Sequence, residues 1–146
     1  MSIVSIRAAL KTQLDALVTA GTLGTVFNGE QPNNVVEVPA WPAVEIVRSN
    51  IEPDYLDNRD DFPAYVFRIN IYQQLEEDNW HTVEIAGDAL IDAILQALIR
   101  VPSLSGAAIG RMRPMEGEAG VLSWQGKQVR RDTLVVKYRD ILSMDA

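Results

Sequence analysis

Three acids in a row, followed closely by the only histidine, are the residues of this chain best suited to chemistry. They lie in the stretch LEEDNWHTVE (75–84) and are Glu76, Glu77 and Asp78. Carboxylates beside an imidazole, here that of His81, can act as general acids and bases or bind a divalent cation. No second histidine stands at ligand spacing, whereas structural zinc sites normally take four Cys or His ligands. The residue types therefore allow a site without specifying one.

The same stretch also suits the start of a helix. Asp78 and Asn79 are favourable N-cap residues directly before Trp80, where a helical period begins, and acids near a helix N-terminus interact well with its dipole. We interpret the stretch as a helix start with exposed acids, and His81 as an exposed first-turn residue. A cation site made of carboxylate oxygens is the alternative.

A second acidic stretch, DYLDNRDD, is similar to a calcium-binding loop in its spacing of aspartates. These are Asp54, Asp57, Asp60 and Asp61. The central glycine and the terminal bidentate glutamate of such loops are missing. We expect an acidic surface loop.

Nucleophile and nucleotide motifs are absent from the sequence. Ser103, Ser105 and Ser123 lack a G-x-S-x-G frame, and the glycine-rich residues 106–120 contain neither phosphate-binding pattern. The chain has no cysteine, which excludes disulfides, thiolate zinc sites and a cysteine nucleophile. We expect no catalytic residue, no cofactor and no metal.

Charge is divided unevenly along the chain. From Glu52 to Asp92 there are eleven acids and two bases, whereas from Arg100 to Arg139 there are eight bases and three acids. Surfaces of opposite sign can dock copies head to tail. The basic candidates for such an interface are Arg111, Arg113, Arg130 and Arg131, and the acidic ones are Asp54, Asp57, Asp60, Asp61, Glu76, Glu77 and Asp78. The alternative is ordinary solvated surface, with charge protecting strand edges.

The bulk composition is that of a globular protein. Its 146 residues suit a single domain (1–146), and 47% of them are hydrophobic. A net charge of −7 argues against general nucleic-acid binding. No run reaches the roughly 18–20 apolar residues of a membrane helix, so we expect no membrane partner. The N-terminus has no secretory pattern, which predicts a cytoplasmic location.

Two segments have helical periodicity. In the first, apolar residues recur every three or four positions, with Arg7, Lys11 and Asp15 on the other side, and Gly21 suits the position past its end. In the second, 80–100, one apolar stripe contains Val83, Ala86, Leu90, Ile94 and Ala97, and Ile91, Leu95 and Leu98 widen it. So broad a stripe predicts burial against a sheet.

The remaining segments predict strands. Residues 43–48 and 64–75 alternate, and three short strands are expected at 109–114, 121–124 and 133–139. The fold class is therefore α+β, with a mostly antiparallel sheet and two main helices packed on one face. Long loops are expected around 28–42, 50–62 and 113–120, and loops of such length commonly bind a partner.

The order of these elements resembles that of a known family. The helix SIRAALKTQLDAL, the strand WPAVEIV, the segment YVFRINIYQQL before EIAGDALIDAILQAL, and the closing RRDTLVVKYRDIL are similar to tail terminator, or tail-completion, proteins of long-tailed bacteriophages. The resemblance covers most of the chain and is one of pattern. The family has no catalytic motif, so no residue role is carried over.

The resemblance implies a structural subunit of the virion, assembled in the host cytoplasm. Its partners would be copies of itself in a ring, usually a hexamer, the tail tube protein, the head-completion or neck protein and possibly the sheath. DNA would only pass through the lumen. A head-closure (stopper) protein or another neck or minor tail protein is the nearest alternative. A small metal-dependent hydrolase using the acids and His81, and a monomeric adaptor, are the other two.

Overall fold

The computed structural model describes residues 3–28, 38–52, 60–61, 64–75, 79–100, 110–124, 127–139 and 142–143. Within these ranges the chain forms two helices and seven strands. In chain order they are α1 (Ile3–Thr19), β1 (Thr25–Asn28), β2 (Ala43–Glu52), β3 (Asp60–Asp61), β4 (Ala64–Gln74), α2 (Trp80–Arg100), β5 (Gly110–Trp124), β6 (Lys127–Arg139) and β7 (Leu142–Ser143).

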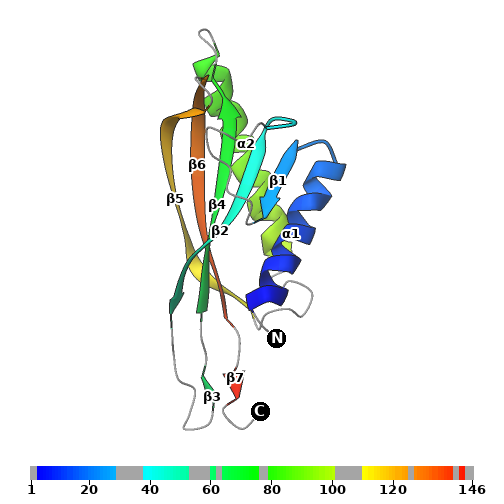
Figure 1. Cartoon of the computed structure of the whole chain (residues 1–146), viewed down its shortest axis with the longest axis vertical. Helices are drawn as coiled ribbons and strands as arrows, with labels where there is room; N and C mark the ends of the chain where they lie inside the picture. Colours follow the sequence, from blue (N-terminus) through cyan, green and yellow to red (C-terminus); the bar gives the residue numbers. More distant parts are fainter. Residues whose placement is uncertain are drawn as a thin grey trace.

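Five strands form one sheet in the order β1-β2-β4-β6-β5 (Figure 1). All neighbours in it are antiparallel except β1 and β2, which are parallel. The short strands β3 and β7 pair separately, at one end of the long axis of the molecule. The predicted α+β class with a mostly antiparallel sheet is confirmed.

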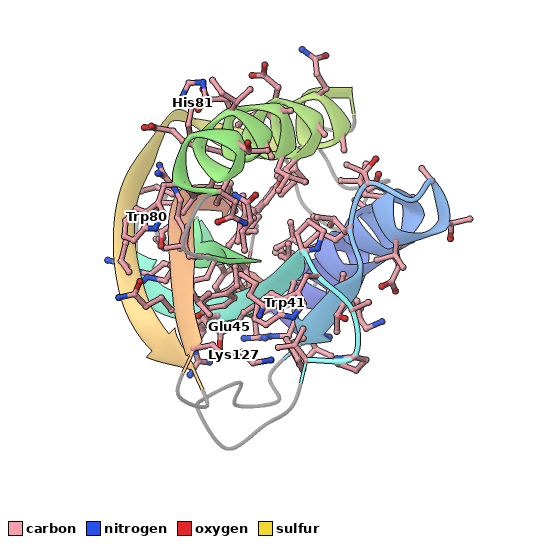
Figure 2. The ribbon with its side chains drawn as sticks, turned by 90° about the horizontal axis from the view of Figure 1, so that it is seen from above. Trp41, Glu45, Trp80, His81 and Lys127 are labelled. Atoms are coloured by element: carbon pink, nitrogen blue, oxygen red, sulfur yellow. The ribbon has the colours of Figure 1, made fainter. Side chains whose placement is uncertain are left out.

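Both helices lie on the same face of the sheet, and they also contact each other (Figure 2). The alternation predicted in β4 explains this, since Phe67, Ile69 and Ile71 point to the helices and are fully buried. They pack in one cluster with buried apolar residues of both helices: Ile6, Leu10, Leu14, Leu90, Ile94 and Leu98. We call the other face of the sheet the helix-free face.

The first helix ends as its sequence predicts. Gly21 has a positive φ of 83°, its N–H donates to the carbonyl of Val18, and the N–H of Thr22 donates to that of Leu17. This pair of bonds is the Schellman motif, in which glycine avoids the strain of a left-handed conformation. The exposed pair Lys11–Asp15 lies 2.7 Å apart on the outer side of the helix.

Arg7 was wrongly placed on that outer side. It turns toward the sheet and is partly buried, with Nη1 donating to the backbone carbonyl of Ile46 at 3.1 Å and to Asn28 Oδ1 at 3.3 Å. The guanidinium carbon lies 5.5 Å from the ring centroid of Phe67. A long side chain can cover apolar surface while its charged end finds acceptors, and periodicity alone does not reveal this.

The second helix begins at Trp80, as predicted, with the N–H of Val83 donating to the carbonyl of Asn79. Ala86 is exposed, which corrects its place on the predicted stripe, and the neighbouring Gly87 is buried instead. A Cβ on Gly87 would lie 3.0 Å from Gln73 Nε2 and 3.1 Å from Asp132 Oδ2. The helix therefore lies close to the sheet at a position where it has no side chain.

The strand predictions for the C-terminal part were wrong in their boundaries. Residues expected as two strands with a loop at 113–120 form one strand, β5, which pairs with β6 from Gly110 to Trp124. The register shifts between Met112 and Glu116, and this irregularity on an edge strand accommodates Pro114, which has no N–H to donate. Strand β6 also begins at Lys127, earlier than expected.

The predicted loop at 50–62 is also shorter than expected. Strand β2 continues to Glu52, and Asp60–Asp61 form β3, so the segment 50–62 contains regular structure at both ends. Residues 53–59 and 62–63, and 29–37 of the loop 28–42, lie outside the described residues.

Candidate functional site

The predicted acidic interface residues are mostly beyond the described part of the chain. Asp54, Asp57, Glu76, Glu77 and Asp78 lie outside it. Asp60 and Asp61 are placed in β3, opposite Ser143 and Leu142 of β7. Their side chains are outside the description, so the structure leaves the acidic half of the interface as a prediction.

The basic candidates divide between the edge strand and β6. Arg111 lies in β5 opposite Tyr138, and Arg113 lies in the irregular stretch after Met112; both side chains are outside the description. Arg130 and Arg131 point to opposite faces of the sheet, as their adjacency in a strand requires. The structure therefore does not gather the four arginines into one cluster.

Arg130 points to the helices and is used within the chain. Its Nε and Nη2 donate to the two carboxylate oxygens of Asp132 at 3.2 and 3.3 Å, and Nη1 lies 3.8 Å from Glu84 Oε1 of α2. The hydrogen bond that Arg130 donates to Asp132 is the main cause of the raised pKa of Arg130. Because Asp132 is nearly fully buried, this forked pair neutralises a carboxylate beneath the start of α2.

A row of polar side chains crosses the helix-free face. Glu45, Asn70 and Thr133 are directly opposite one another in β2, β4 and β6. Thr133 Oγ1 donates to Asn70 Oδ1 at 2.7 Å, and Asn70 Nδ2 donates to Glu45 Oε1 at 2.8 Å. The hydroxyl of Tyr72 donates to the same Glu45 oxygen at 2.8 Å. Figure 2 shows Glu45 on the side of the sheet away from α2.

Tyr72 remains protonated in this environment. Burial, followed by the hydrogen bond to Glu45 and its negative charge, raises the pKa of Tyr72 well above the usual value of 10.0, while Arg131 nearby lowers it. A neutral phenol and an amide both donate to one carboxylate, so the row is bonded internally. Such a network fixes the register of three strands and offers no free nucleophile.

Sequence reasoning missed this row. The available signal was that Glu45 interrupts the apolar run AVEIV and Asn70 interrupts FRINIY. Polar residues at the middle of apolar strands need partners when buried. Without the strand register, however, the sequence does not indicate which residues are opposite one another.

A small apolar cluster closes one end of the helix-free face. Phe27, Ala43, Tyr72 and Val129 are buried there, with Val38 and Trp41 packed against them. Beside it, an open pocket of about 200 Å³ is lined by Trp41, Pro42, Gln73, Gln74 and Val83. The pocket lies at the first turn of α2, where the exposed Trp80 is also found.

His81 is exposed on the first turn of α2 and projects away from the sheet (Figure 2). Among the described residues, no three His, Asp or Glu side chains are grouped so that they would hold a metal ion. None of the described helices combines the length and the apolar character needed to cross a bilayer.

Comparison with models of known protein families gives no match, and no curated protein is significantly similar in sequence.

Proposed function

We propose that this chain is a tail terminator subunit of a long-tailed phage or prophage, a structural protein that forms a ring on the end of the tail tube. The observation that carries the proposal is the chain-long order of elements. The helix, proline-flanked strand, long strand, second helix and closing strand that carry the resemblance correspond to α1, β2, β4, α2 and β6.

The described contacts support a structural role. Arg130 and Asp132 bond to each other along β6. The row through Glu45 is bonded across β2, β4 and β6. They stabilise the fold and the strand register. In the proposed ring, heterologous contacts between copies close on themselves, block further addition of tube subunits and leave one face of the ring for the neck.

The test is binding to tube ends. Tail tubes would be assembled from the tube protein of the same phage or prophage, mixed with the purified protein, and examined by electron microscopy for a ring at one end. We expect the ring, and no further growth when tube protein is added in excess. Light scattering of the protein alone would show whether the ring forms before it meets the tube.

The stopper alternative predicts a different partner. A stopper binds the connector of the DNA-filled head and leaves tube growth unchanged. A protein that binds heads but neither caps nor arrests tubes would replace the terminator assignment with the stopper assignment. A protein that binds neither would overturn both.

A further inference from the structure

A second pocket, of about 180 Å³, lies where the N-terminal end of α1 meets β2. It is lined by Ile3, Val4, Arg7 and Arg48. Arg7 is held in place by its bonds to Ile46 and Asn28. Arg48 is exposed and lies directly opposite Phe67, the ring over which Arg7 stacks. The pocket is therefore lined by two arginines, one of which stacks on a buried aromatic ring.

The positive charge of this pocket has no counter-charge among the described residues. Neither Arg7 nor Arg48 has a described carboxylate within ion-pair distance, and the first turn of α1 contains no acid. Elsewhere in the described chain, Lys11 and Arg130 each have a carboxylate partner. This local excess of cations occurs in a protein of net charge −7.

The rim of the pocket is also apolar. Val4 has 74% of its surface exposed, although a residue of this type is commonly buried. A suitable occupant therefore combines carboxylates with apolar side chains. A carboxylate would form charge-assisted bonds with the arginines, and Arg7 would lose little side-chain freedom because it is already fixed.

We propose that the pocket binds the acidic segment 52–61 of a second copy of the chain. This segment has five acids and one base, and the aspartates at 54 and 57 flank Tyr55 and Leu56. Its composition matches two arginines beside apolar residues. Strand β3, which contains Asp60 and Asp61 of this segment, lies at one end of the long axis, beyond the N-terminal end of α1 (Figure 1). An extremity that docks on the body of the next copy makes a heterologous contact, as a ring needs.

This inference rests on the proposed ring and gives it a specific contact. It differs from the interface predicted from charge along the sequence, because the basic partner is Arg7 and Arg48 instead of the arginines of β5 and β6. The acidic partner includes the predicted Asp54, Asp57, Asp60 and Asp61.

A charge exchange tests the contact. Arg48→Glu should abolish assembly, and so should Asp54→Lys with Asp57→Lys, because each places like charges together. A mixture of the two variants should recover part of the assembly. In alternating copies, one contact joins the unchanged segment to the unchanged pocket, and the next joins the two reversed charges, with Arg7 unchanged. Lys127→Glu changes the charge equally at an exposed position at the far end of β6 and should assemble normally. Thermal unfolding of each variant would confirm that it folds.

Disulfide trapping gives a readout independent of the tube. The chain has no cysteine, so a copy with Arg48→Cys and a tagged copy with Asp57→Cys carry one thiol each. We expect roughly tenfold more mixed disulfide than with Lys127→Cys and Asp57→Cys, because docking raises the effective concentration of the thiols.

The outcomes separate the inference from the function. If the wild type caps tubes while the charge variants also cap them and no mixed disulfide accumulates, the contact is refuted and the terminator function stands. If the mixed disulfide forms but tubes are not capped, the contact stands and the function is refuted. Cross-linking of Arg48→Cys to the tube protein in place of a second copy would also refute the proposed occupant.

Discussion

At the scale of single residues, Gly24 is constrained by the backbone it touches. A Cβ at this position would lie 2.7 Å from both the carbonyl carbon and the carbonyl oxygen of Ala40. The N–H of Gly24 donates to the carbonyl of Pro42 at 2.8 Å. We expect Gly24→Ala to lower the free energy of unfolding by about 2–3 kcal/mol, because the clash is with backbone and relief requires a chain shift. Urea denaturation measures this.

Gly120→Ala is the matched control. A Cβ there meets nothing within 4 Å, so its effect should stay within about 0.5 kcal/mol. Equal losses in the two variants would show that steric contact is not the cause.

Arg130 and Glu84 allow the strengths of two ion pairs to be compared. The Asp132 side chain is 5% exposed and depends on Arg130, whereas Glu84 is 60% exposed and 3.8 Å away. Arg130→Met should cost about 3 kcal/mol, since it leaves a buried carboxylate without its charged partner. Glu84→Gln should cost less than about 0.5 kcal/mol. Similar losses in denaturation experiments would contradict the role given to Asp132. Because Arg130 stabilises the fold by pairing with Asp132, replacing Arg131 is the better test of a role of these two arginines in assembly.

At the scale of elements, the polar row makes the stability of the paired strands β2, β4 and β6 depend on pH in the alkaline range. The pKa of Tyr72 is raised in the folded state above its unfolded value of 10.0, so its contribution to stability is fully present below about pH 10 and falls as the pH rises further. Tyr72→Phe loses the bond to Glu45, at a cost of about 1 kcal/mol near pH 8.

The difference in unfolding free energy between the wild type and Tyr72→Phe should therefore narrow between about pH 10 and 11, just above the ordinary tyrosine value. Comparing the two proteins cancels the titration of the other tyrosines. A difference that stays constant through this range would mean that Tyr72 has an unperturbed pKa.

The elements differ in how far the sequence predicts them. Both helices and β4 were predicted because their signals are local: a 3.6-residue or two-residue period, an N-cap at Asn79 and a C-terminal Gly21. Strand β5 was divided in two because its glycines and Pro114 resemble turns, whereas pairing with β6 holds it extended. Near Pro114 the partner residues are distant in the chain, as Val135 opposite Glu116 shows, so the pairing leaves no local signal there.

The contacts of the candidate site were predictable only in part. Opposite orientations of Arg130 and Arg131 follow from strand geometry. The partners of Arg7 and Glu45 could not be predicted in this way. Ile46 and Asn70 are distant from them in the chain and are brought close only by the register of the sheet.

At the scale of the whole molecule, assembly brings together copies that each carry a net charge of −7. Two electrostatic effects then oppose each other. Net repulsion acts over long distances, and the proposed contact of segment 52–61 with Arg7 and Arg48 acts over a few ångströms. Salt screens the long-range repulsion at lower concentrations than it screens the short-range contact. The reason is that the Debye length falls from about 30 Å at 0.01 M to about 10 Å at 0.1 M and about 3 Å at 1 M.

We therefore expect the association constant of the subunits to rise between 0.01 and 0.1 M salt and to fall between 0.1 and 1 M. Sedimentation at the three salt concentrations, with or without tube ends to nucleate the ring, measures it. For Arg48→Gln, the association constant should still rise between 0.01 and 0.1 M salt, because the rise depends on net charge. It should no longer fall between 0.1 and 1 M, because the fall depends on the contact. Association that strengthens steadily up to 1 M would mean that apolar surface dominates the contact between copies, since burial of apolar groups is strengthened by excluded salts.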